Sequence, residues 1–188
     1  MRNWLLLGLG VAALLGCVAA FGNFEPNTYR VEGNRLFMSG EITPRTPDSF
    51  EAAIEAHPQV DTVVLMDMPG SVDEFAVHDL GYFIRDIGLN THLTPQSEIY
   101  SGAVDVFLAG NRRTMTCCAV IGVHDWADAR REGSSYPRNS EAHDANVTYF
   151  EDMLGSDAFY WFTLQAAPSD EIHVMTKSEL QRYGVLTQ

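Results

Sequence analysis

Short, continuously apolar stretches separated by helical patterns constrain the fold of this chain more than any other feature. Residues 62–66 (TVVLM) and 117–123 (CCAVIGV) are the clearest of these stretches, and each runs into polar or turn-forming residues. A short apolar run without polar alternation is typical of a strand covered on both faces, which occurs mainly in parallel sheets flanked by helices. The pattern therefore predicts an α/β domain with a largely parallel sheet.

The segments around these runs alternate between strand and helix signals. Residues 29–32 and 35–39 predict a hairpin turned at Gly33-Asn34. Apolar spacing predicts helices over residues 46–57, 72–87, 101–109, 147–154 and 156–167, the first of them capped by Thr46 or Asp48. It predicts strands over residues 90–94 and 172–175. Residues 67–71 predict a turn, residues 125–144 an exposed loop or flap, and Thr176 with Glu179 a capping box that opens a final helix to Tyr183.

Composition excludes several classes of protein. With 188 residues, 46% of them hydrophobic, the chain can form one domain with a proper core. Its net charge of −13 repels polyanions, so we expect no nucleic-acid partner. Three cysteines, Cys17, Cys117 and Cys118, cannot build a disulfide framework. We expect the adjacent pair to be small buried residues on opposite faces of a strand.

The first residues have the composition of an export signal. Arg2 is followed by an apolar run over residues 4–15 that is too short to span a bilayer comfortably. Two outcomes stay open: residues 1–20 form a signal peptide cut after Ala20, or residues 1–16 form a lipoprotein leader that ends before a lipidated Cys17. We expect residues 21–28 to be a linker and residues 29–188 to form the single domain. Either leader places the protein in the periplasm or envelope, with membrane anchoring through Cys17 in the second case.

Four blocks, taken in order, resemble the ClpP/crotonase superfamily, and above all the ClpP-like serine peptidases and their uncharacterised exported bacterial relatives. They are residues 63–72 (VVLMDMPGSV), 101–110 (SGAVDVFLAG), 119–124 (AVIGVH) and 174–185 (VMTKSELQRYGV). The resemblance implies a superhelix of repeated β-β-α units. Members of the superfamily often assemble as trimers or rings, which implies a homo-oligomer.

The resemblance also implies roles for particular residues. Ser101 falls at the position of the nucleophilic serine and His124 at that of the base, while the amides of Gly70, Ser71 and Gly102 correspond to the oxyanion hole. The chain departs from the family pattern at Ser71, which replaces a glycine, and at Ile99 and Tyr100, which replace small residues beside the serine. The position of the acid falls nearest Pro168, so either Asp170 takes that role after a small shift or a backbone carbonyl steadies the histidine.

The chemistry of these residues is consistent with the resemblance. A serine hydroxyl needs a base such as imidazole within hydrogen-bond reach, and Ser101 and His124 supply that pair. The chain has no Gly-x-Ser-x-Gly elbow, and Lys177, its single lysine, is poorly placed in a capping box to replace the histidine. Taken alone, each residue has an ordinary interpretation, Ser101 as a helix cap and His124 as a strand-end histidine bonded to a carbonyl.

The sequence thus predicts an exported serine hydrolase that acts on peptide or acyl bonds without a cofactor. The alternative is a catalytically degenerate envelope protein that keeps the fold as a binding or assembly module. His124, Asp125, Asp128, His143 and Asp144 surround one polar segment, but their spacing matches no zinc signature, so we expect no metal.

Overall fold

The computed structural model describes residues 26–187. The expected leader and Cys17 therefore lie outside the described residues, as does most of the expected linker. At the end of that linker, Thr28 already belongs to the first strand, and the side-chain amide of Asn27 donates to the carbonyl oxygens of Ser39 and Glu41. Within residues 26–187, no helix is long and apolar enough to cross a membrane.

Two sheets form the framework of the domain. The larger has the order β1-β2-β3-β5-β7 and contains β1 (Thr28–Glu32), β2 (Arg35–Ser39), β3 (Thr62–Leu65), β5 (Asn90–Leu93) and β7 (Arg113–Met115). The smaller has the order β4-β6-β8-β9 and contains β4 (Asp67–Met68), β6 (Glu98–Tyr100), β8 (Val120–Val123) and β9 (His173–Val174). Among the strands of residues 26–187, only β1 and β9, one at an edge of each sheet, are antiparallel to their neighbours.

The chain builds these sheets through repeated β-β-α units. The strands β3 and β4 precede α2 (Glu74–Asp86), β5 and β6 precede α3 (Gly102–Leu108), and β7 and β8 precede α4 (Asp144–Leu154). Each unit places one strand in each sheet, which confirms the predicted largely parallel α/β fold. The remaining helices are α1 (Thr46–Ala56), α5 (Ala158–Ala166) and α6 (Lys177–Arg182).

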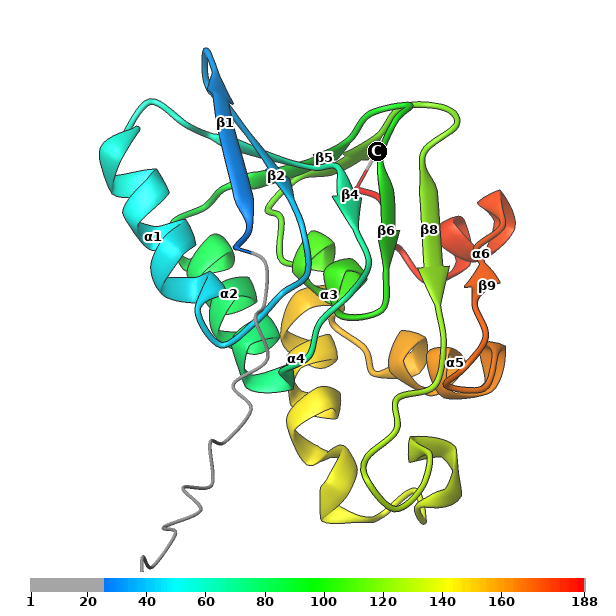
Figure 1. The fold of residues 1–188 in the computed structure, drawn as a ribbon. Helices are drawn as coiled ribbons and strands as arrows, with labels where there is room; N and C mark the ends of the chain where they lie inside the picture. Colours follow the sequence, from blue (N-terminus) through cyan, green and yellow to red (C-terminus); the bar gives the residue numbers. More distant parts are fainter. Residues whose placement is uncertain (1–25, 188) are drawn as a thin grey trace, which may run out of the picture.

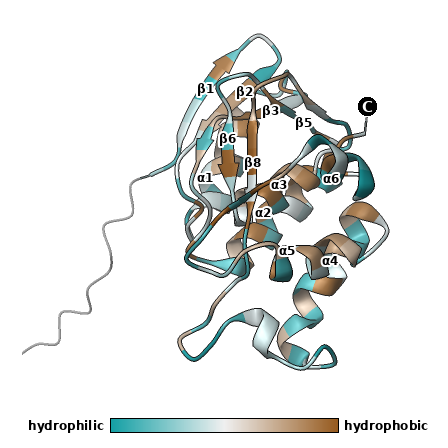
Figure 2. Ribbon diagram, turned by 90° about the vertical axis from the view of Figure 1, so that its right-hand side faces the viewer, coloured by the Kyte–Doolittle hydropathy of each residue, from teal (hydrophilic) through white to brown (hydrophobic). Residues whose placement is uncertain are grey.

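The apolar residues of the units meet between the smaller sheet and the helices. Figure 1 shows β4, β6 and β8 side by side with α3 close by, and in Figure 2 both β8 and α3 are largely hydrophobic. Ile121 and Val123 of β8 and Val104 and Phe107 of α3 are buried in one continuous core. The short α3 is thus fixed by burial on several sides rather than by its own length.

Several local expectations were wrong. The N-cap of α1 is Arg45, because the Thr46 hydroxyl accepts from the amide of Thr43 instead of capping the helix. Cys117 and Cys118 are exposed, because β8 begins only at Val120 and the pair lies in the turn before it. By contrast with the exposed cysteine pair, His78 on α2 is buried: it is 8% exposed and stacks on Tyr149 with ring centroids 4.5 Å apart.

The segment over residues 125–144 is also more ordered than an exposed loop. It contains two short 3₁₀ helices, Gly133–Ser135 and Glu141–His143. Asp125 and His143 are both 1% exposed, which ties the segment to the body of the domain. Many of its other residues are exposed, as expected.

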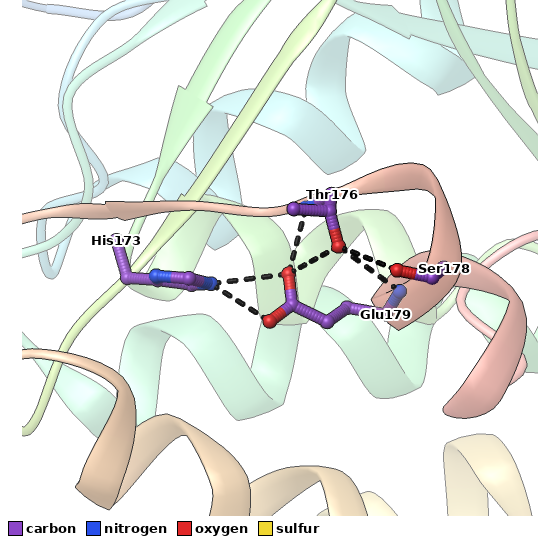
Figure 3. Close-up of polar contacts among 4 residues, drawn as sticks. All are labelled: His173, Thr176, Ser178 and Glu179. Carbon is purple, nitrogen blue, oxygen red and sulfur yellow. Dashed lines mark hydrogen bonds and ion pairs between the residues drawn. The ribbon is translucent and has the colours of Figure 1, made fainter.

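The predicted capping box at the start of α6 is confirmed. The Thr176 hydroxyl accepts from the Glu179 amide, and the Glu179 carboxylate accepts from the Thr176 amide at 2.7 Å (Figure 3). The same carboxylate faces His173 Nε2 at 3.1 Å, so β9 and α6 are joined at this point. The amide of Thr176 holds the pKa of Glu179 below its usual value.

Candidate active site

The ends of three neighbouring strands bring the predicted site residues together. In the smaller sheet β6 lies between β4 and β8, all three parallel, with Met68 opposite Ile99 and Tyr100 opposite Gly122. Each strand is followed at once by a candidate segment: Gly70-Ser71 after β4, Ser101 after β6 and His124 after β8. Because carboxyl ends of parallel strands share one edge, Ser101 lies between the other two segments.

Ser101 occupies a backbone conformation that serine rarely adopts. Its φ is 52° and its ψ is −133°, and it is one of two non-glycine residues with positive φ in the described chain. The conformation is held from both sides, because its amide donates to the Gly122 carbonyl at 3.0 Å and its carbonyl accepts from the Val104 amide at 2.8 Å. Although Ser101 is the N-cap residue of α3, its side chain makes no capping hydrogen bond. The ordinary interpretation of this serine as a helix cap therefore does not hold, and its hydroxyl remains available.

Two glycines allow the backbone to close around Ser101. A Cβ on Gly70, whose φ is +130°, would lie 3.0 Å from the Ser101 Cβ, and one on Gly102 would lie 2.5 Å from the Ser71 hydroxyl oxygen. The Gly102 amide opens a helix and so has no partner within it. Neither Gly70 nor Ser71 donates a backbone hydrogen bond to another residue in the described range. The three amides predicted for an oxyanion hole thus lie close to the serine and lack partners there.

His124 is oriented by the backbone next to it. Its Nδ1 lies 2.6 Å from the carbonyl oxygen of Asp125, and because a carbonyl only accepts, the imidazole must donate from Nδ1. This leaves Nε2 with the lone pair that a general base requires. The side chain of Asp125 is engaged elsewhere, since its carboxylate accepts from the Ser134 amide at 2.9 Å.

Ser101 and His124 line one cavity of about 570 Å³. Ser71, Gly102, Trp126 and Tyr160 also line it. Within residues 26–187, Ser101 and His124 share no hydrogen bond in this conformation. The two residues therefore line the same cavity, but no hydrogen bond connects their side chains.

The other candidate residues lie apart from this cavity. Asp170 is exposed in the turn before β9, does not line the cavity and makes no hydrogen bond with His124. Lys177 is exposed on α6. No group of three or more His, Cys, Asp or Glu side chains within the described range is arranged to hold a metal ion.

Sequence reasoning did not find the acidic residues of the cavity. Asp105 and Glu74 both line it, and Glu74 accepts a hydrogen bond from the side-chain amide of Asn146. Burial, together with the nearby Glu74 charge, raises the pKa of Asp105 to about 7. The signal in the sequence was composition, because Asp105 is the single charged residue in the otherwise apolar segment 102–109.

The arrangement of the described chain is found in known structures. The 1510-N membrane-bound stomatin-specific protease is similar with a TM-score of 0.55 at 15% identity, over 80% of this chain and 75% of that one. Methylmalonyl CoA decarboxylase is similar with a TM-score of 0.54 at 7% identity, over 88% of this chain and 67% of that one. This chain has the ClpP/crotonase fold. An enoyl-CoA hydratase from Mycobacterium ulcerans is also similar, with a TM-score of 0.51 at 10% identity over 87% of this chain and 76% of that one.

The ClpP/crotonase fold by itself does not select a reaction. A protease, a decarboxylase and a hydratase share it at identities where the likeness concerns the fold alone. No family model matches the sequence, and no curated protein matches it either. Within this fold the function must be argued from the residues at the carboxyl ends of β4, β6 and β8.

Proposed function

We propose that this protein is a serine hydrolase that cleaves peptide or acyl bonds with Ser101 as nucleophile and His124 as general base. The observation that carries the proposal is the conformation of Ser101. A serine with φ 52° costs folding free energy of about 1 to 3 kcal/mol, and such costs are concentrated at functional sites. Here the strained residue lines a cavity and leaves its hydroxyl without a capping bond.

The proposed reaction uses the groups around Ser101 in a fixed order. The Ser101 hydroxyl oxygen attacks the substrate carbonyl carbon, and its proton passes to His124 Nε2. Negative charge on the carbonyl oxygen is stabilised by the amides of Gly102 and of Gly70 or Ser71. The protonated His124 then donates to the leaving group, and water repeats the sequence on the acyl-enzyme. The Asp125 carbonyl that accepts from Nδ1 orients the imidazole, which supports a serine–histidine pair steadied by a backbone carbonyl rather than by an acidic side chain.

This mechanism requires the Ser101 hydroxyl and the His124 imidazole to come within hydrogen-bond distance of each other. A side-chain rotation that brings the Ser101 hydroxyl to His124 Nε2 completes the pair, and catalytic hydrogen bonds often shorten when substrate binds. A protein in which this rotation never occurs would be the catalytically degenerate binding module instead. One labelling experiment separates the two functions.

The experiment is covalent labelling by a small fluorophosphonate, followed by mass spectrometry. We expect wild type to be labelled at Ser101, and Ser101→Ala and His124→Ala to be labelled at least about 100-fold more slowly. Ser134→Ala and His57→Ala, at positions outside the cavity, serve as matched controls and should react like wild type. A folded wild type that stays unlabelled would support the binding module and contradict the hydrolase.

Export is a separate part of the proposal and rests on the apolar run over residues 4–15. Full-length protein expressed in a bacterium should be recovered either cut after Ala20 or retained in the membrane fraction through Cys17. In the second case Cys17→Ser should release it. Recovery of only uncut protein from the cytoplasm would contradict export.

A further inference from the structure

The cavity beside Ser101 is acidic, and the basic side chain that lines it is the imidazole of His124. Four carboxylates line it, from Asp73, Glu74, Asp105 and Asp128, and no lysine or arginine does. The lining of the cavity therefore has an excess of negative charge, which favours binding of a cation from outside the described chain.

Three of the four carboxylates already have hydrogen-bond donors. Asp73 caps α2 by accepting from the Ala76 amide at 2.8 Å. Asp128 accepts from the Arg130 and Arg131 amides at 2.7 and 2.9 Å and from the Tyr136 hydroxyl. Glu74 accepts from Asn146. The Asp105 carboxylate has no hydrogen-bond partner within residues 26–187.

Asp105 shares the cavity with the reacting serine. It lies on α3, which begins directly after Ser101, and both residues line the cavity. The Tyr149 hydroxyl donates to the backbone carbonyl of Asp105 at 2.8 Å, which fixes this turn of the helix without satisfying the carboxylate. An ionised carboxylate in such a position is costly unless a positive group pairs with it.

The rest of the cavity suits a long side chain with a charged end. Val77, Val123 and Phe150 supply apolar wall, and Trp126 and Tyr160 supply aromatic rings. Lysine and arginine bury apolar stems while their charged heads seek anions or aromatic faces. The combination of apolar wall and unpartnered carboxylate matches this chemistry.

We propose that the cavity binds a lysine or arginine side chain of the substrate next to the bond that Ser101 attacks, and that Asp105 determines this specificity. Glu74 adds to the negative potential at the same end of the cavity. The assignment of the bound side chain to a substrate rests on the proposed hydrolase function. Binding of a cation by the cavity does not itself require catalysis.

The test measures binding to the full chain carrying Ser101→Ala, so that nothing is hydrolysed. N-acetyl-arginine amide is compared by calorimetry with N-acetyl-citrulline amide, a neutral molecule of nearly the same shape, at pH 8. We expect the arginine amide to bind at least about ten-fold more tightly. Adding Asp105→Asn should remove this preference, and Glu74→Gln should reduce it. Asp86→Asn, a matched change of an exposed carboxylate on α2 outside the cavity, should keep it.

Equal binding of the two amides, no binding of either, or a preference that survives Asp105→Asn in folded protein would overturn the inference. The comparison of the two amides needs no variant at Asp105, so it remains decisive if Asp105→Asn fails to fold. Fluorophosphonate labelling separates this result from the fate of the hydrolase. A labelled protein without charge preference contradicts the specificity alone, whereas an unlabelled protein that prefers arginine amide contradicts the hydrolase alone.

Discussion

Ser101 with φ 52° is held in place by its neighbours in the smaller sheet and in α3. Its amide bonds to Gly122 and its carbonyl to Val104, so the strain is distributed between a strand contact and a helix turn. The role of this serine was expected from the resemblance of residues 101–110 to the ClpP/crotonase superfamily. Its conformation could not be predicted, because positive φ in serine depends on contacts with residues far along the chain.

Gly70 tests whether the close approach to Ser101 matters for reactivity. Gly70→Ala combines strain at φ +130° with a Cβ 3.0 Å from the Ser101 Cβ, so we expect fluorophosphonate labelling to slow by about 100-fold. Gly88→Ala is the matched control, because Gly88 has φ +75° with nothing within 4 Å of a new Cβ. Both variants should lose about 1 to 2 kcal/mol of stability, measured by urea unfolding. Equal labelling rates in the two variants would show that Gly70 does not shape the site.

Asp105 makes stability depend on pH. Its pKa is raised from 3.8 to about 7 in the folded state, so folding favours the protonated form. The stabilisation that this provides is complete below pH 4 and is lost as pH rises through 7. Between pH 5 and 8, wild type should lose about 3 kcal/mol more unfolding free energy than Asp105→Asn, measured by urea denaturation. Asp86→Asn is the control and should follow wild type. If the unfolding free energies of wild type and Asp105→Asn change in parallel with pH, Asp105 does not titrate in this way.

Among the elements, the long apolar runs were predictable, whereas the short strands β4 and β6 were not. β3 and β8 contain continuous buried residues and were expected from pattern alone. β6 has three residues, of which Ile99 is buried, and β4 has two, so neither is long enough for periodicity to appear. They become strands because their neighbours offer hydrogen-bond partners, which is a property of the assembled sheet.

The α6 capping box shows how a short helix depends on its first turn. Thr176→Val removes the hydroxyl that accepts from the Glu179 amide while keeping the side-chain shape (Figure 3), so we expect a loss of about 1 kcal/mol in urea unfolding. Thr148→Val on α4 is the matched control, because its exposed hydroxyl donates to the Asp144 carbonyl without capping a helix. If Thr176→Val loses no more unfolding free energy than Thr148→Val, the packing of Leu180 and not the cap holds α6.

At the scale of the whole molecule, the segment over residues 125–144 closes one side of the cavity and is anchored to α5. The Tyr160 hydroxyl lies 2.9 Å from Trp126 Nε1, which donates to it, and 2.6 Å from His143 Nδ1. Burial raises the pKa of Tyr160, so its hydroxyl stays protonated. Two parts of the segment thus meet at a single side chain of the helix.

Tyr160→Phe should loosen this segment. It leaves Trp126 and His143 without their shared partner, so we expect a loss of about 1 to 3 kcal/mol in unfolding free energy. Trypsin should also cut faster at Arg130, Arg131 and Arg138, all exposed in the segment. Tyr82→Phe is the matched control, because its hydroxyl bonds to the exposed Asp152 elsewhere on the surface. Unchanged cleavage in Tyr160→Phe would show that other contacts hold the segment.

The sequence by itself determined the α/β class and the order of the main elements, because apolar runs and the turns after them are local properties of a chain. The candidates Ser101, Gly70, Ser71, Gly102 and His124 came from the resemblance of these segments to the ClpP/crotonase superfamily. Only the tertiary structure decided which of these residues meet. The order β4-β6-β8 places Ser101 between Gly70 and His124, leaves Asp170 outside and brings Asp105 and Glu74 to the same cavity. The physical reason is that strand order and register follow from pairing between distant segments, and local sequence patterns do not specify which segments pair.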